Sequence, residues 1–395
     1  MNYENNEMEI LLSAFVAGMS ILTACSSDDN NDNDGNGGNG NGNEIENGTI
    51  LKGTITSDVT LAAGNTYKLS GEYIVEEGAT LHIEEGVKII AVYDDIADYI
   101  LVKQGGKINA VGTPDKPIVM TSEKEEPGAW GGIHICGRAH TNAEGGKGSS
   151  EIGGAVYGGN DDADNSGTLQ YIRLEYTGFA FDEEHEANGI SFYGVGNGTI
   201  VDHCQAYKGS DDGFEFFGGS VNVSNLVAVS CSDDSFDWTE GWNGKGTNLV
   251  AYQEAESTLG YDCDCLMECD NNGSNNAATP VAHPVLKNLI LVGNGGSKQG
   301  IRLRAGTEVE IDNAKVCGKG QPLTVETALT ENALKNGTSK LTNITLTSEL
   351  SCKEGIYTHA DFIAVTSNKV DANLSYSSFE DIKKECSWMN GSWVK

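Results

Sequence analysis

One block of sequence occurs twice in the middle of the chain, at Val201–Phe216 and again at Val223–Trp238. The offset is 22 residues, so the pair Asp211–Asp212 falls on Asp233–Asp234. A repeat of this length is typical of a solenoid, in which one repeat cannot bury its apolar face alone and must stack on its neighbours. The repeat therefore constrains the fold more than any other feature of the sequence.

The residues around the repeat predict strands rather than helices. From about residue 48 short apolar runs alternate with turns rich in Gly, Asn and Asp, whereas a helix needs apolar residues at i, i+3 and i+4 over a longer window. The one helical pattern in this part lies at about 326–335. Successive parallel strands need crossover connections, which each coil of a solenoid supplies. We therefore predict an all-β chain, a right-handed parallel β-helix over 48–377, with 378–395 covering its open end.

A second repeated signature supports this architecture. One position preceding an alternating apolar run is Tyr, His or Asn in seven segments, at Tyr171, His203, Asn225, Asn248, Asn288, Asn313 and Asn343. Asn side chains stacked at one corner of successive coils form a hydrogen-bonded ladder along the axis. The irregular spacing of these positions indicates a constant coil with loops of different lengths inserted.

The N-terminus has the organisation of an exported, tethered protein. Residues 9–24 form a short apolar stretch that predicts a signal peptide at 1–24, and Leu22–Cys25 resembles a bacterial lipobox with Cys25 as the acylated residue. The following acidic segment, 25–47, is almost entirely Ser, Asp, Asn and Gly, which predicts a disordered tether. The membrane is thus expected to be contacted only through the lipid on Cys25.

Charge and cysteine content restrict the partners. The formal net charge is −33, which repels nucleic acid and attracts cations, so we expect no nucleic-acid partner. Nine cysteines remain besides Cys25. Cys352 and Cys386 are a candidate disulfide for an exported protein, while buried free thiols in the solenoid core are the alternative.

Apolar–polar–apolar triplets recur in the coils and predict a row of outward side chains on one sheet face. In chain order this row is His134, Ser191, Glu215, Asp237, Glu268 and Arg302. Like charges directly opposite each other on neighbouring strands are destabilising, so three adjacent carboxylates need compensation.

The repeated Asp pairs lie beside this row and offer the oxygen ligands that calcium prefers. The candidate metal ligands are Asp211, Asp212, Asp233 and Asp234, and calcium is the candidate ion. The candidate ligand-binding residues are His134, Glu215, Asp237, Trp238, Glu268, Arg302 and Arg304. Loops at 137–168 and 253–284 would wall this face.

Three interpretations of the acidic face remain open. It is a solvated surface, a groove for calcium or another ligand, or a catalytic site in which Glu215 and Asp237 act with Arg302. Trp238 beside the carboxylates suits a sugar ring, but its position in the alternation also suits the core.

The chain resembles a family of Bacteroidetes surface lipoproteins with a pectin-lyase-like β-helix. The acidic start of the tether, Ser26–Asp29, is similar to their export signal. The resemblance rests on Gly112–Pro114, Trp130–Gly132, Tyr157–Gly159, Asp164–Gly167, Asn188–Gly189, Phe217–Gly219, Asp233–Asp237, Trp388 and Trp393. It implies a protein anchored in the outer membrane and facing the exterior, with other outer-membrane proteins as potential partners.

A broader resemblance, to polygalacturonase-like glycosidases, assigns the acids to the Asp pairs and the basic segment to Arg302–Arg304. We therefore expect a surface module that binds a glycan or another extracellular polymer on the acidic face, with calcium. The alternatives are a glycosidase or pectate-lyase-like lyase, and a structural spacer or adhesin.

Overall fold

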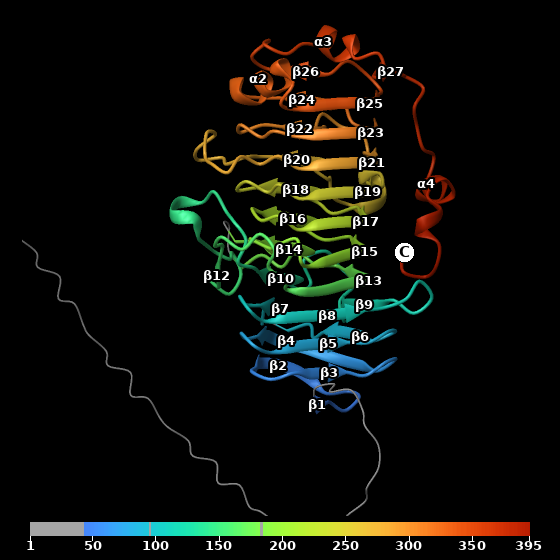
Figure 1. Ribbon diagram of the computed structural model, residues 1–395. Helices are drawn as coiled ribbons and strands as arrows, with labels where there is room; N and C mark the ends of the chain where they lie inside the picture. The colour runs from blue at the N-terminus through green and yellow to red at the C-terminus, as the bar shows by residue number, and fades with distance from the viewer. Residues whose placement is uncertain (1–42, 95, 182–184) are drawn as a thin grey trace, which may run out of the picture. The chain divides into compact units, whose positions relative to one another are not determined.

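The computed structural model describes residues 43–94, 96–181 and 185–395. The predicted signal peptide at 1–24, the lipidation site Cys25 and most of the predicted tether at 25–47 lie outside these residues. All described strands except β11 and β12 form one continuous 25-stranded sheet with parallel pairing, wound as a β-helix (Figure 1). The predicted all-β fold is confirmed. The first strand, β1 (Asn43–Glu44), begins at residue 43 rather than 48.

One stack of strands carries the predicted outward row and is called the site stack here. It consists of β2 (Ile50–Ile55), the second half of β4 (Thr66–Val75), β7 (Tyr99–Val102), β10 (Ile133–Cys136), β14 (Ile190–Tyr193), β16 (Phe214–Phe217), β18 (Phe236–Thr239), β20 (Met267–Cys269), β22 (Gln299–Leu303), β24 (Gln321–Val325) and β26 (Ser351–Cys352).

The second stack forms the rest of the wall. It consists of β1, β3 (Val59–Leu61), β5 (Thr80–Ile83), β8 (Lys107–Val111), β13 (Gly167–Glu175), β15 (Ile200–Tyr207), β17 (Asn222–Val229), β19 (Lys245–Tyr252), β21 (Val285–Val292), β23 (Glu310–Cys317), β25 (Lys340–Leu346) and β27 (Lys369–Val370). In the first coils a third face is separate, formed by the first half of β4 with β6 (Lys88–Ala91) and β9 (Ile118–Ser122).

The long strands of the later coils each cover two of these faces. The first half of β13 pairs with β8 and its second half pairs with β9, and between the halves Tyr171 has a φ of 52°. The equivalent positions His203, Asn225, Asn248, Asn288, Asn313 and Asn343 all have φ between 53° and 63°. Asn tolerates this left-handed conformation better than most residues, which explains its recurrence at the bend.

The predicted Asn ladder is confirmed. Asn248 Nδ2 donates to Asn225 Oδ1 at 2.8 Å, Asn288 to Asn248 at 3.0 Å, and Asn313 to Asn288 at 2.9 Å. Asn343 ends the ladder differently, because its amide donates to Asp312 at 2.6 Å. The bends of successive coils are therefore held in register by side chains as well as by the sheet.

Inward residues of the strands form a continuous core along the axis. Aromatic rings stack between coils, with centroids 5.0 Å apart for Phe192 and Phe216 and 5.6 Å apart for Phe214 and Phe236. Trp242 lies on Phe216 with a centroid separation of 4.2 Å. Stacked rings bury much apolar area in a geometry favourable to π systems, so the core supports the coils that carry the site.

The end of the chain lies elsewhere than predicted. Residues 378–395, with α4 (Phe379–Glu385) and the 3-10 turn η2 (Ser387–Met389), lie beside the second stack, as the red segment of Figure 1 shows. Ile382, Met389 and Trp393 are fully buried there against the outward apolar residues Val227 and Val250. This segment is called the strap below.

The open end of the helix is covered instead by two helices, α2 (Ala328–Asn336) and α3 (His359–Ala364). Phe362 of α3 and Leu334 of α2 belong to the main core. The buried carboxylate of Glu331 accepts backbone N–H groups of Glu354, Ile356 and Tyr357, which fixes α2 to the following loop. The helical pattern predicted at 326–335 is thus α2.

The remaining elements lie in loops, namely η1 (Glu144–Gly146), β11 (Gly148–Ser149), β12 (Val156–Tyr157) and α1 (Glu256–Leu259). The cysteines of the described part are free thiols, so the candidate disulfide between Cys352 and Cys386 is not formed; Cys352 lies in β26, and Cys386 is in the strap. Within that part no helix is long and apolar enough to cross a membrane.

Candidate functional site

The predicted outward row exists in the predicted register. His134 is opposite Ser191, Ser191 opposite Glu215, and Glu215 opposite Asp237. Asp237 is then opposite Glu268, and Glu268 opposite Arg302. The period-2 alternation of strands places all six side chains on the same outward face.

Two of the predicted ligand-binding residues are not accessible. His134 is fully buried, its Nε2 lies 2.6 Å from the Gly131 carbonyl, and burial lowers its pKa to about 4. It is covered because the loop after β10 packs an apolar cluster, including Ile152 and Tyr157, over this part of the outward face. Trp238 is 1% exposed and belongs to the core, since it follows the outward Asp237 and so points inward.

The carboxylates of the row open into one acidic pocket of about 390 Å³. Its lining residues are Glu151, Glu186, Asp211, Asp212, Glu215, Asp233, Asp234, Asp237, Asp264, Glu268 and Arg302. Arg302 is the one basic residue among these described lining residues. Glu151 comes from the loop predicted at 137–168 and Asp264 from the loop predicted at 253–284, so both loops contribute to the walls.

Burial and mutual repulsion shift the protonation of these carboxyl groups. Burial, followed by the charge of Asp233, raises the pKa of Asp211 to about 8. Burial raises the pKa of Glu151 to about 7. The pKa values of Asp212, Glu215 and Asp237 all lie well above the ordinary range, first because of burial and second because of neighbouring carboxylates. The environment of the pocket therefore favours the neutral form of these carboxyl groups or a compensating positive charge.

Two clusters in the pocket have donor atoms close enough to share one ion. Oxygens of Asp211, Asp212 and Asp233 lie within 4.8 Å of one another and form the outer cluster. Oxygens of Asp212, Glu215 and Asp237 lie within the same distance and form the inner cluster. Both clusters consist of oxygen donors, which calcium prefers. Three of the four predicted metal ligands thus come together, and Asp212 belongs to both clusters.

The inner cluster contains unsatisfied acceptors. Asp237 Oδ1 is buried and has no hydrogen-bond partner. Asn188, which is 1% exposed, donates from Nδ2 to Glu215 Oε2 at 2.5 Å, while its own Oδ1 is buried without a donor. A buried acceptor without a partner costs about 1–3 kcal/mol. These oxygens therefore favour a cation at the inner cluster.

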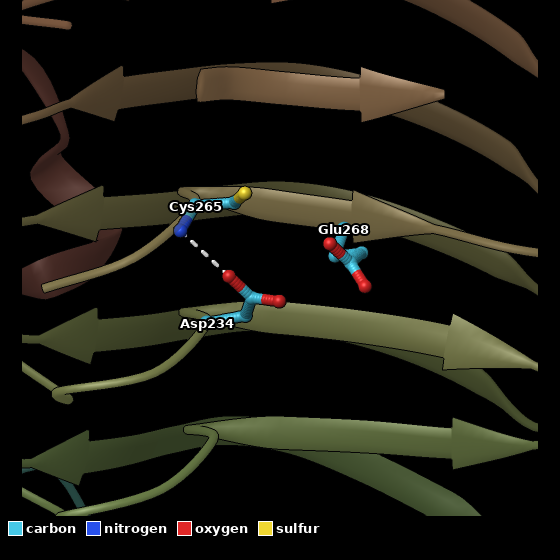
Figure 2. A group of neighbouring side chains, drawn as sticks. All are labelled: Asp234, Cys265 and Glu268. Carbon is cyan, nitrogen blue, oxygen red and sulfur yellow. Dashed lines mark hydrogen bonds between the residues drawn. The ribbon is translucent and has the colours of Figure 1, made fainter. Parts of the chain in front are cut away.

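The fourth predicted metal ligand, Asp234, lies in a different group. Figure 2 shows Asp234 with Cys265 and Glu268, and the Cys265 backbone N–H donates to Asp234 Oδ1 at 2.6 Å. Burial raises the pKa of the Cys265 thiol, which keeps it neutral, whereas a metal ligand is the thiolate. Glu268 is neutralised by Arg302 at 2.8 Å and by Arg304. This group is less suited to a cation than the other two.

Comparison with known families decides what kind of β-helix this is. A family model described as a pectate-lyase like beta helix domain matches residues 53–395. The chain belongs to this pectate-lyase-like β-helix family. No curated protein and no solved structure matches it. The fold suggests a carbohydrate-related function, while the chemistry must be argued from the site itself.

In this pectate-lyase-like β-helix the two arginines are held in ion pairs. Arg302 binds Glu268 and Glu326, at 2.8 and 3.1 Å, and Arg304 binds Asp270 at 2.7 Å. Burial alone would lower the pKa of Arg302, but its bonds to Glu326 and Glu268 outweigh this and raise it. Arg302 is therefore a firmly charged cation rather than a proton acceptor.

Sequence reasoning missed four residues of the site. Asp264 lines the pocket from the loop at 253–284, which was predicted as a wall without this residue. Glu151 and Glu186 enter the pocket from loops that the 22-residue repeat does not include, and no spacing in the sequence indicates them.

Asn188 precedes β14, and the sequence indicates it only as part of the Asn188–Gly189 motif. Asn188 lies two residues before Ile190, the first residue of β14. Strand β14 pairs with β16, which carries Glu215, so the two side chains come from neighbouring coils.

Proposed function

We propose that the protein is a cell-surface module, tethered through an acylated Cys25, that binds an extracellular glycan through divalent cations held in the acidic pocket. Calcium is the ion that fits best, because the two central clusters offer oxygen donors alone. The observation that carries the proposal is the convergence of ten carboxylates on one pocket with Arg302 as the lone basic residue in its described lining.

The charge balance argues for cations in the pocket. Asp264 is paired with Lys298, and Glu268 with Arg302 and Arg304. The central carboxylates Asp212, Glu215 and Asp237 remain within 4.8 Å of one another. At an effective dielectric constant of about 20, two unit charges at 4.8 Å repel by about 3.5 kcal/mol. A divalent cation replaces this repulsion with attraction.

The pocket also limits how a glycan is bound. Trp238 and Trp242 are each 1% exposed, so neither offers a face on which a sugar ring stacks. Calcium takes six to eight oxygen ligands, more than either cluster supplies from one oxygen per residue. Hydroxyl or carboxylate oxygens of a glycan complete such a shell. We therefore expect binding to depend on calcium and to favour glycans that carry carboxylates.

A polysaccharide-active enzyme is the second candidate, with Glu215 and Asp237 as its carboxylic acids. The observation that favours it is the raised pKa of Glu215, which suits a proton donor next to a second carboxyl group. A lyase that uses Arg302 as its base is disfavoured, because the ion pairs with Glu268 and Glu326 hold that guanidinium charged.

Gel retardation and chain length, measured together on a panel of acidic and neutral polysaccharides, test the proposal. We expect retardation of an acidic glycan in calcium, its loss with chelator, and no shortening of the chains. Glu215→Gln and Asp237→Asn should abolish retardation, whereas Glu349→Gln, the same charge change at an exposed residue, should not. Calcium-dependent shortening would identify an enzyme instead. Absence of any effect across the panel would leave a spacer or adhesin.

A further inference from the structure

The two oxygen clusters of the pocket share one residue. The outer cluster is Asp211, Asp212 and Asp233, and the inner cluster is Asp212, Glu215 and Asp237. Asp212 is 6% exposed, and one of its oxygens, Oδ1, already accepts the Asp234 backbone N–H at 2.8 Å. This bond holds the carboxylate in place between the two clusters. A carboxylate held between two sets of ligands is suited to bridging two ions.

A single ion would leave one of the two clusters uncompensated. One divalent cation at the outer cluster leaves Glu215 and Asp237 facing each other across neighbouring strands β16 and β18. One at the inner cluster leaves Asp211 next to Asp233, whose oxygens lie within 4.8 Å of each other. Both arrangements retain like charges in a buried site, where they cost more than at the surface.

An independent observation marks the inner cluster as a ligand site. Two buried oxygens on either side of Glu215, Asp237 Oδ1 and Asn188 Oδ1, have no donor. Asn188 is 1% exposed and is oriented by its bonds to Glu215 and to Ser191 Oγ, the latter at 3.0 Å. The amide of Asn188 therefore lies against the cluster and keeps one polar atom, Oδ1, without a partner.

We infer that the pocket binds two calcium-like ions, bridged by Asp212, with the inner ion held by Asp212, Glu215 and Asp237 beside the Asn188 amide. The inference rests on the proposed cation binding and adds to it the number of ions and their distribution. The outer ion is the more accessible of the two, because its ligand Asp233 is exposed, whereas Glu215 and Asp237 of the inner cluster are half-buried. It is therefore the ion that contacts a glycan, and the inner ion fixes the bridging carboxylate.

Calcium titration of the chelator-treated protein by calorimetry, with ions counted by native mass spectrometry, tests this inference without any glycan. We expect two ions per chain. Glu215→Gln and Asp237→Asn should each leave one ion, as should Asp233→Asn, while Asp212→Asn should lower affinity at both sites by at least tenfold. Asn188→Ala should weaken the inner ion more than the outer ion. The exposed control Glu349→Gln should keep both.

The outcomes separate the two claims. One ion per wild-type chain, or two ions retained in Glu215→Gln, would overturn the two-ion arrangement while leaving cation-dependent glycan binding in place. No calcium bound at all would overturn both. Two ions without glycan retardation would support the arrangement and reject the glycan. Thermal unfolding followed by circular dichroism confirms that each variant is folded before it is counted.

Discussion

Asp212→Asn should change stability in opposite directions with and without calcium. In chelator the variant removes one charge from two clusters whose oxygens lie within 4.8 Å. Full ionisation of one such pair would cost about 3.5 kcal/mol at an effective dielectric constant of about 20. Burial and the charge of Asp211 raise the pKa of Asp212 and so favour its neutral form, which reduces the expected gain to about 1–2 kcal/mol. The amide oxygen can still accept the Asp234 N–H, so this hydrogen bond is kept.

In calcium the same substitution should destabilise. Each ion bound at a concentration of 100 times its Kd stabilises the folded state by about 2.7 kcal/mol, or about 5 °C in Tm for a chain of this size. The variant should lose most of this gain at both sites. Differential scanning calorimetry at pH 8, in calcium and in chelator, measures both effects, with Glu349→Gln as the control. A variant that is less stable in chelator, and that gains as much from calcium as the wild type, would refute the reasoning.

Three further predictions concern pH, the Asn ladder and the strap. The folded-state pKa of Asp211, about 8, lies above its ordinary value of 3.8. The contribution of Asp211 to folding stability is therefore complete below about pH 4 and is lost as the pH rises to 8. The chelated protein should have a higher Tm at pH 5 than at pH 8, and calcium should reduce this difference. Asn248→Ala should lower the free energy of unfolding in denaturant by about 2–3 kcal/mol, because Ala is strained in the left-handed conformation and two ladder bonds are lost. Asn248→Gly, which relieves the strain at φ 59°, should cost about 1 kcal/mol less. Equal losses in the two variants would contradict the strain argument. Trp393→Ala should destabilise by about 3 kcal/mol or more, because this side chain of the strap is fully buried against the second stack. Trp388→Ala, whose side chain is partly exposed, should cost clearly less.

Much of the site follows from the alternation of short strands. Because successive side chains point to opposite faces, the spacing of Glu215, Asp237 and Glu268 was enough to predict one row in register. The same rule places Trp238 inside, as the structure has it. The burial of His134 could not be predicted, because it depends on the path of the 137–168 loop, and loops follow no period.

Apolar runs in the sequence indicate where the strap packs. Leu226–Val229, Leu249–Ala251 and Leu289–Val292 are apolar at every position rather than at alternate ones. A strand without polar alternation is buried on both faces, so these runs predict a cover on the outside of the second stack. The last coil of the solenoid also needs a cover, and α2 and α3 supply that cover. The end of the chain lies elsewhere, because the strap returns along the second stack.

The segments that cover the outside of the β-helix explain why the acidic pocket lies on β16 to β22 of the site stack. The second stack is closed by the strap from β13 to β23, and the first part of the site stack is closed by the loop that buries His134. Between these covers, β16 to β22 of the site stack keep their outward side chains accessible through the pocket, and these are Glu215, Asp237, Glu268 and Arg302. Carboxylates that only keep a surface soluble would be spread over exposed coils. Here they gather where the loops lower their exposure, which raises their pKa and increases the free energy gained when a cation binds.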